Sequence, residues 1–191
     1  MTRDYELKRR AEQMEDTRRR IVEAAIELHR TVGPGRTTVS AVAERAGVQR
    51  QTYYRHFPEE TTLLTACSSL DMERNPMPDP ERWREIADPL ERLRHALDEL
   101  YGYYAANKTL VANLIRDLEV HEATQAVVGE ILPPALAAMH AALAEGFEGR
   151  QAGPAIQLMM DFHTWRMLTE QGLSQEETVD FAVRQVGCAA G

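Results

Sequence analysis

Gly47 is the residue that most narrows the folds open to this chain, because it joins two short helical patterns with almost no loop between them. Thr38 is a suitable N-cap for the first pattern, which covers residues 39–46 and has apolar residues at helical spacing. The second pattern runs from about Gln49 to His56. Glycine tolerates the left-handed conformation that ends one helix and redirects the chain. The segment therefore predicts two short helices joined by a tight turn.

Amphipathic helices are predicted on both sides of this pair. One runs from Asp16 or Thr17 to about Thr31 and has a single apolar face. That face consists of Ile21, Ala24, Ala25 and Leu28. Residues 1–15 have no such stripe and are expected to form a charged arm. Another helix is predicted to begin near Glu59, where acidic residues suit the positive end of the helix dipole.

Three prolines at alternate positions make residues 75–80 the clearest boundary in the chain. They interrupt a helix because proline has no amide N–H and restricts the residue before it. Longer helical patterns follow, and the one at residues 122–147 is expected to be kinked or split by Pro133 and Pro134. No run of residues alternates with the period of a strand. We therefore predict an all-α protein of about nine helices, with an N-terminal three-helix helix-turn-helix domain and a C-terminal helical bundle. The predicted parts are an arm at 1–15, a helix-turn-helix domain at 16–74 and a helical domain at 75–191.

The end of the chain is expected to form a homodimer contact. Residues 154–171 are apolar nearly all round, and a helix without a polar face is buried on two sides. Ser174 and Glu177 form a capping box for a final helix that has its own apolar face. In a chain of this size, no partner within the same chain is left for the second face of these two C-terminal helices. A second copy is therefore expected to pack on residues 154–187 by an isologous contact.

The composition argues against several classes of protein. Two cysteines, Cys67 and Cys188, are too few for a disulfide framework, which fits a reducing cytoplasm. The six histidines lack metal-ligand spacing, and the sequence has no phosphate-binding glycine loop or nucleophile elbow. We therefore expect no enzyme, no metal and no cofactor. Because the sequence has no unbroken run of about 18 apolar residues, we expect no membrane span.

Charge is divided unevenly along the chain. The formal net charge is −8. Residues 1–66 hold 12 basic and 10 acidic residues, whereas the rest of the chain holds 10 basic and 20 acidic residues. Salt screens charges over about 10 Å, so attraction to phosphates is local. A mildly basic N-terminal part on an acidic body is therefore compatible with nucleic-acid binding by that part alone.

Residues 35–64, GRTTVSAVAERAGVQRQTYYRHFPEETTLL, resemble the N-terminal domain of the TetR/AcrR (tetracycline-repressor-like) family of transcriptional regulators. The matching features are the Thr-Val start of the first short helix, the Ala46-Gly47-Val48 turn, and His56-Phe57 before a helix that is acidic and then leucine-rich. Over about 50 residues the resemblance is close, and beyond them only the helical pattern is similar. The resemblance implies a ligand-responsive repressor that binds a palindromic DNA operator as a homodimer.

The resemblance assigns the DNA contacts mainly to the second short helix, the recognition helix. Arg50 and Gln51 open it, and their side chains suit guanine and adenine edges respectively. Thr52, Tyr54 and His56 match family positions that bind backbone phosphates. The complete predicted DNA-binding set is Thr38, Ser40, Gln49, Arg50, Gln51, Thr52, Tyr54, Arg55 and His56.

The chain departs from the family pattern at two places. Gln49-Arg50-Gln51 replaces the usual Ser-x-Gly entry to the recognition helix, which predicts a more polar reading surface. Glu60 stands where the family commonly has a phosphate-binding lysine, and a carboxylate there repels DNA mildly. Basic residues at 8–10 or 18–20 are candidates to compensate.

The resemblance also implies that the C-terminal domain binds a small-molecule effector that changes the separation of two DNA-binding domains. The side chains suited to lining its pocket or giving specificity are Tyr101, Tyr104, Asn113, Arg116, His121, Met159, Phe162 and Trp165. Two alternatives stay open. One is an all-helical binding module that has lost DNA affinity, and the other is an activator without a small-molecule effector.

Overall fold

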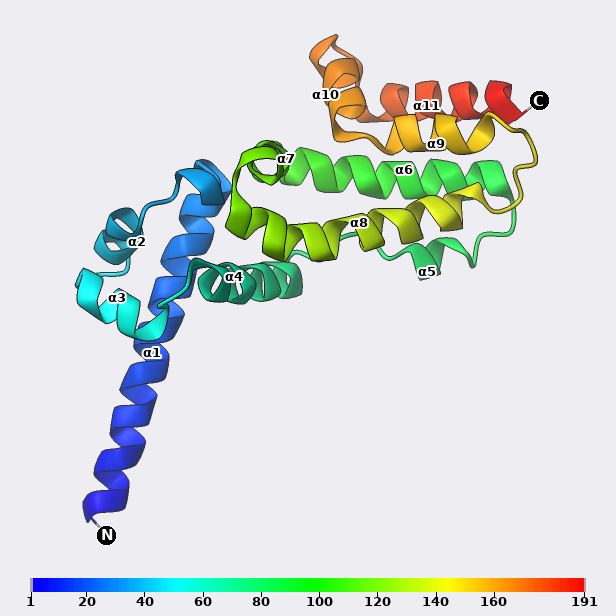
Figure 1. Ribbon diagram of the computed structural model, residues 1–191. Coiled ribbons are helices and arrows are strands. Elements are labelled where there is room, and N and C mark those ends of the chain that lie inside the picture. The colour runs from blue at the N-terminus through cyan, green and yellow to red at the C-terminus, as the bar shows by residue number, and fades with distance from the viewer. Residues whose placement is uncertain (1, 191) are drawn as a thin grey trace. The chain divides into compact units, whose positions relative to one another are not determined.

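The computed structural model describes residues 2–190, and the side chains of residues 5–190. In this range the chain forms eleven α-helices and one short 3-10 helix, with no strand, which confirms the all-α prediction (Figure 1). The elements are α1 (Thr2–Thr31), η1 (Pro34–Arg36), α2 (Val39–Arg45), α3 (Arg50–His56), α4 (Glu60–Arg74), α5 (Pro80–Trp83), α6 (Pro89–Ala106), α7 (Lys108–Val120), α8 (Glu122–Ala144), α9 (Ala152–Met160), α10 (Phe162–Glu170) and α11 (Gln175–Ala190).

The contacts between residues divide the chain into two compact units. The first unit contains the residues up to Pro76 together with Ala112–Glu130. The second unit contains Met77–Val111 and the residues from Ile131 onward. The stretch Ala112–Glu130 therefore packs with the N-terminal helices, although it lies within the helical domain predicted for residues 75–191. The predicted domain limits themselves stay predictions.

The first unit has a core built by α1, α2, α3 and α4. On α1 the predicted apolar face packs inward, with Ile21 and Ala25 fully buried. The other helices and the turn after α3 contribute apolar and aromatic side chains to the same cluster: Val42, Ala43, Ala46, Tyr53, Phe57, Leu63 and Cys67. This core holds α2 and α3 in place, so that the short helices do not depend on their own weak stability.

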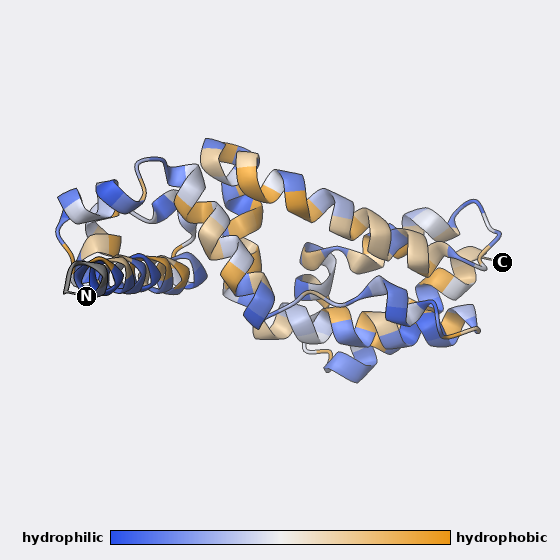
Figure 2. Cartoon of the chain, turned by 90° about the horizontal axis from the view of Figure 1, so that it is seen from below, coloured by the Kyte–Doolittle hydropathy of each residue, from blue (hydrophilic) through white to orange (hydrophobic). Residues whose placement is uncertain are grey.

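The charged arm expected at residues 1–15 is helical over its described part, because α1 begins at Thr2. Its composition explains this, since alanine, glutamate, lysine, arginine and glutamine are strong helix formers. The side chains from Tyr5 to Asp16 are exposed. In Figure 2 these N-terminal turns, seen nearly end-on, are mostly hydrophilic.

The second unit is held together by α6, which packs against α9 and α11. Leu93, Leu97 and Leu100 of α6 are fully buried. The predicted capping box at the start of α11 is confirmed by two reciprocal hydrogen bonds. The Ser174 N–H donates to the Glu177 carboxylate at 2.8 Å, and the Glu177 N–H donates to the Ser174 hydroxyl at 3.2 Å.

The helix count differs from the prediction of about nine at two points. α5 was not expected, and the single helix predicted at residues 154–171 is divided into α9 and α10. Asp161 lies at the division with an extended backbone, and its side chain accepts the Thr164 N–H at 2.9 Å. The strong N-cap preference of aspartate therefore outweighs the apolar periodicity around it. By contrast, α8 is not split, although Pro133 and Pro134 lie inside it.

α8 corrects the expectation that no segment is long and apolar enough to span a membrane. It is the one helix in the described part of the chain that meets this test, with a window of 18 residues whose mean hydropathy is 1.5 and of which 22% is buried. The sequence criterion missed it because Glu130, His140 and the two prolines interrupt the apolar run. A single helix of this kind is weak evidence for a membrane span.

Candidate nucleic-acid interface

The turn between α2 and α3 has the predicted geometry. Thr38 caps α2 by accepting the Ala41 N–H at 3.2 Å. Gly47 follows α2 in the left-handed region, with φ of 64°. The Val48 N–H then donates back to the Ala43 carbonyl at 2.9 Å, and this pattern of bonds is that of a Schellman motif. The chain thus turns within three residues and starts α3 at a fixed angle to α2.

α3 has one buried face and one exposed face. Tyr53, near the middle of the helix, is buried in the core. Its ring packs edge-on against Tyr54 at 5.4 Å between centroids, and Tyr54 is exposed. Arg50 and Gln51 are also exposed, at the first turn of the helix. The outer face of α3 therefore presents guanidinium, amide and phenol groups together, which are the groups that contact base edges and phosphates.

All nine predicted DNA-binding residues lie in this helix-turn-helix. The exposed members are Thr38, Ser40, Gln49, Arg50, Gln51, Tyr54 and Arg55, and the partly buried members are Thr52 and His56. The structure brings them together on α2, α3 and the adjoining turn. Their contacts with DNA stay predictions.

His56 differs from the other eight. Its Nε2 atom is buried and has no hydrogen-bond partner among the described residues. Burial lowers the pKa of His56, and the nearby positive charges of Arg55 and Arg18 lower it further. Because its Nε2 atom is buried and its lowered pKa disfavours the charged ring, His56 is the weakest phosphate candidate of the set.

The basic residues of α1 that were candidates to compensate for Glu60 fall into two groups. Arg19 and Arg20 lie 2.8 and 3.8 Å from the carboxylate of Asp16, and Arg18 lies over the Phe57 ring at 4.9 Å from its centroid. The basic side chains at 8–10 are exposed and form no ion pair with any residue whose side chain is described. The group at 8–10 is therefore the better placed to meet a polyanion.

Five of the eight predicted ligand-binding side chains lie in the second unit. They are Tyr101, Tyr104, Met159, Phe162 and Trp165. The Tyr104 ring packs against Phe162 and Trp165 at 5.4 and 5.6 Å. The hydroxyl groups of Tyr101 and Tyr104 donate to the last carbonyls of α9 at 2.8 and 2.7 Å, and burial raises the pKa of both tyrosines. These side chains form a packed cluster, and their role in ligand binding stays a prediction.

The other three predicted ligand-binding residues, Asn113, Arg116 and His121, lie in the first unit and contact its N-terminal helices. The Asn113 amide donates to the Thr31 carbonyl at 3.2 Å, and the Arg116 guanidinium donates to the Val32 carbonyl at 2.9 Å. The His121 Nε2 atom lies 3.4 Å from the Glu60 carboxylate. The eight residues are therefore divided between the two units, and their role in ligand binding stays a prediction.

Asp117 is a residue that the sequence reasoning missed. It is 1% exposed, and its carboxylate accepts the Gly35 N–H at 2.9 Å and the Arg116 Nε–H at 2.8 Å. A Cβ atom on Gly33, whose φ is 90°, would lie 2.6 Å from the same carboxylate. Because Gly33 and Gly35 have no side chains, the Asp117 carboxylate, about 80 residues away in the sequence, can approach their backbone closely. In the sequence, the one mark of Asp117 is that it follows an arginine in the stretch that forms α7.

These features define an all-α protein with an N-terminal helix-turn-helix domain. Comparison with known proteins supports the same assignment for the N-terminal region. The family model described as "Bacterial regulatory proteins, tetR family" matches residues 21–67. The HTH-type transcriptional regulator TtgR of Pseudomonas putida is 31% identical over 97 residues, which cover 50% of this chain and 46% of TtgR. The chain thus spans about half the length of the curated relatives it matches. Residues 21–67 are therefore similar to the N-terminal domain of the tetR family of bacterial regulatory proteins.

Solved structures share the fold over most of the chain. AibR, solved in complex with isovaleryl coenzyme A and operator DNA, has a TM-score of 0.62 at 20% identity over 87% of this chain and 96% of that one. The transcriptional regulator FadR from Bacillus subtilis, solved with stearoyl-CoA, has a TM-score of 0.54 at 21% identity over 90% and 97%. At this level of identity the likeness establishes the fold alone.

Proposed function

We propose that the chain is a transcriptional repressor that binds a palindromic DNA operator as a homodimer and is released by a small-molecule effector. The observation that carries the proposal is the exposed face of α3, where Arg50, Gln51 and Tyr54 project beside the capped start of α2. TtgR is described as a transcriptional regulator, and AibR was solved with operator DNA. A cytoplasmic location and the absence of enzymatic activity belong to the same proposal.

The homodimer is supported by apolar side chains left exposed on the helices predicted to form it. Leu158 on α9 and Met167 on α10 are each 55% exposed. Both lie within residues 154–187, for which an isologous contact was predicted. Two copies of one apolar face related by a two-fold axis bury each other, which is the commonest arrangement in homo-oligomers.

The effector is supported by the ligands of the structural neighbours. AibR and FadR were each solved with an acyl-coenzyme A. The apolar window of α8 has a mean hydropathy of 1.5 and is 22% buried, and Ile131, Leu132 and Leu136 in it are only partly covered, which gives an acyl chain some apolar surface to contact. Both observations favour an effector with a large apolar part.

The proposal is tested by titrating the full chain into labelled DNA from the region flanking its gene, and following fluorescence anisotropy over a range of salt. A dimer that engages about six phosphates gives a slope of about −5 in a plot of log K against log salt. Shuffled DNA of the same composition measures non-specific binding. Equal affinity for both fragments, or a flat response to salt, contradicts the proposal and favours a binding module without DNA affinity.

Two substitutions on α3 are expected to have different effects in this assay. Arg50→Ala is expected to weaken operator binding about tenfold and to relax preference at one base pair, because its guanidinium reads a base edge. Tyr54→Phe removes a hydrogen bond to a phosphate and is expected to weaken binding about threefold on every sequence. Arg150→Ala, an exposed arginine of the second unit outside residues 154–187, is the matched control. Unchanged affinity in both α3 variants contradicts the assignment.

The basic side chains at 8–10 are expected to bind further phosphates. Replacing Lys8, Arg9 and Arg10 together by alanine is expected to reduce the steepness of the salt dependence by up to about 2.7, or about 0.9 for each phosphate no longer bound. Affinity for shuffled DNA is expected to fall as much as affinity for the operator, since phosphates carry no sequence information. Arg19→Ala is the control, because Arg19 is already paired with Asp16. An unchanged slope in the triple variant leaves the arm without a role in binding.

A further inference from the structure

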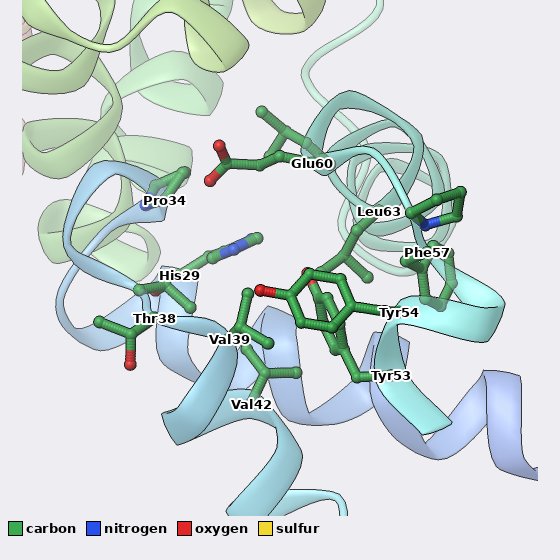
Figure 3. Close-up of a pocket in the computed structure, with 13 residues that line it drawn as sticks. His29, Pro34, Thr38, Val39, Val42, Tyr53, Tyr54, Phe57, Glu60 and Leu63 are labelled. Atoms are coloured by element: carbon green, nitrogen blue, oxygen red, sulfur yellow. The ribbon is translucent and has the colours of Figure 1, made fainter. Parts of the chain in front are cut away.

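A pocket of about 180 Å³ opens in the first unit, between the start of α2 and the start of α4 (Figure 3). Its walls are polar and apolar in about equal measure and come from α1, η1, α2, α3 and α4. The apolar lining consists of Pro34, Val39, Val42, Phe57, Pro58, Leu63 and Leu64. The pocket is slightly larger than the engineered cavity of about 150 Å³ that binds benzene, so it has room for a small ring.

Polar side chains converge on this space. His29 and Tyr53 are only 9% and 4% exposed, and neither the His29 ring nor the Tyr53 hydroxyl forms a hydrogen bond to a described residue. Figure 3 shows the His29 ring and the Tyr54 hydroxyl directed toward the middle of the lining, and the Glu60 carboxylate directed toward Pro34. Neither the His29 ring nor the Tyr53 hydroxyl is among the buried polar atoms that lack a partner, so the polar atoms of both are open to the pocket and can bond a ligand or solvent there.

The charge of the pocket selects the kind of ligand. Burial lowers the pKa of His29 to about 4, and burial together with Glu60 raises the pKa of Tyr53 to about 12. At neutral pH both groups are uncharged and each can accept a hydrogen bond. The carboxylate of Glu60, whose side chain is 56% exposed, supplies the one formal charge of the lining and lies 3.4 Å from His121 Nε2. A negative charge beside two tyrosine rings favours an organic cation.

We propose that this pocket binds a small organic amine, and that the bound cation strengthens DNA binding. The ammonium group donates to Glu60, His29 and Tyr53, and the apolar body lies between Val39 and Leu63. Because Thr38 and Tyr54 also line the pocket, the cation sits beside two predicted phosphate contacts. It thereby restores positive charge near Glu60, where the family commonly has a lysine. This last step rests on the proposed function, whereas amine binding does not.

Amine binding is tested on the full chain without DNA, by calorimetric and NMR titration with benzylamine. Saturable binding is expected, with a dissociation constant on the order of 1 mM for a ligand of this size. Benzyl alcohol, which has the same shape without the charge, is expected to bind at least about tenfold more weakly. No saturation by benzylamine, or equal binding of the two compounds, overturns the proposal.

Variants locate the amine at the pocket. Glu60→Gln is expected to weaken benzylamine binding about tenfold, through the loss of one charge-assisted hydrogen bond. Glu59→Gln changes a neighbouring exposed carboxylate that does not line the pocket, and is expected to leave binding unchanged. Val39→Leu narrows the pocket without changing its charge and is also expected to weaken binding. If Glu60→Gln and Glu59→Gln lose benzylamine affinity equally, the amine binds elsewhere and the proposed site is wrong.

The effect on DNA is measured separately. Saturating benzylamine is expected to raise operator affinity about threefold in the unmodified chain and to leave Glu60→Gln unchanged. If benzylamine binds through Glu60 and operator affinity does not rise, the coupling to DNA is overturned while the site stands. If benzylamine binds through Glu60 and the chain binds no DNA, the site again stands and the proposed function fails.

Discussion

Replacing Asp117 by alanine is expected to lower the free energy of unfolding of the first unit by about 3 kcal/mol. The carboxylate is buried and accepts hydrogen bonds from the Gly35 N–H and from the Arg116 guanidinium. Alanine leaves both donors without this partner at a site that water reaches poorly. The cost of an unpaired buried donor is larger than the net gain from a single hydrogen bond, which is why the expected effect is large.

The measurement must report on the first unit. Both tryptophans, Trp83 and Trp165, lie in the second unit, so their fluorescence follows that unit instead. Hydrogen–deuterium exchange of peptides from α1 to α4, together with urea unfolding followed by circular dichroism, is suitable. Glu119→Ala, an exposed acid on the same helix, is the control and is expected to change stability by less than about 0.5 kcal/mol. Equal exchange rates in the two variants show that Asp117 does not hold α7 to the N-terminal helices.

Acid is expected to destabilise the first unit through His29. Burial lowers its pKa to about 4, against about 6.5 in an unfolded chain, so the unfolded state binds the proton more readily. The stability contributed by neutral His29 is present in full above about pH 6.5 and is lost as the pH falls toward 4. The loss amounts to about 2–3 kcal/mol. Asp117 and Asp71 oppose the lowering of the pKa of His29, and His121 adds to it.

The check is a comparison of the unmodified chain with His29→Gln at about pH 7.5 and pH 4.5, by urea unfolding. The variant lacks the titrating ring, so its stability is expected to fall less over the same interval. His56, whose pKa is also lowered by burial, contributes in the same direction in both proteins. Identical pH dependence in the two proteins rules out His29 as the source of the acid sensitivity.

The parts of the fold that were predicted from sequence are those with local signals. The cap at Thr38, the left-handed Gly47 and the box of Ser174 with Glu177 each involve residues close in the chain, and the structure confirms all three. Composition and periodicity were sufficient for the helical class. The division at Asp161 was missed because apolar spacing continues across it while the side chain caps a new helix.

Contacts between distant residues were not predicted. The bond from Gly35 to Asp117 joins segments with no shared motif, and nothing local marks either residue as a partner of the other. The pocket beside Glu60 is likewise assembled from α1, α2, α3 and α4, and its unpaired groups are visible only once those helices are packed. Residues of the recognition helix were selected because a family pattern marks them, and their contacts with DNA stay predictions. Arg116 and His121 were selected for their chemistry, and their contacts with Val32 and Glu60 could not be predicted from any local signal.

The inclusion of Ala112–Glu130 in the first unit has a consequence for protein engineering. A fragment that stops at Pro76 lacks the acid that receives the Gly35 amide and the side chains that bind the carbonyls at the end of α1. Chimaeras that exchange DNA-reading modules between relatives therefore need two crossover segments rather than one, so that the transplanted module brings its own supporting stretch of α7 and α8.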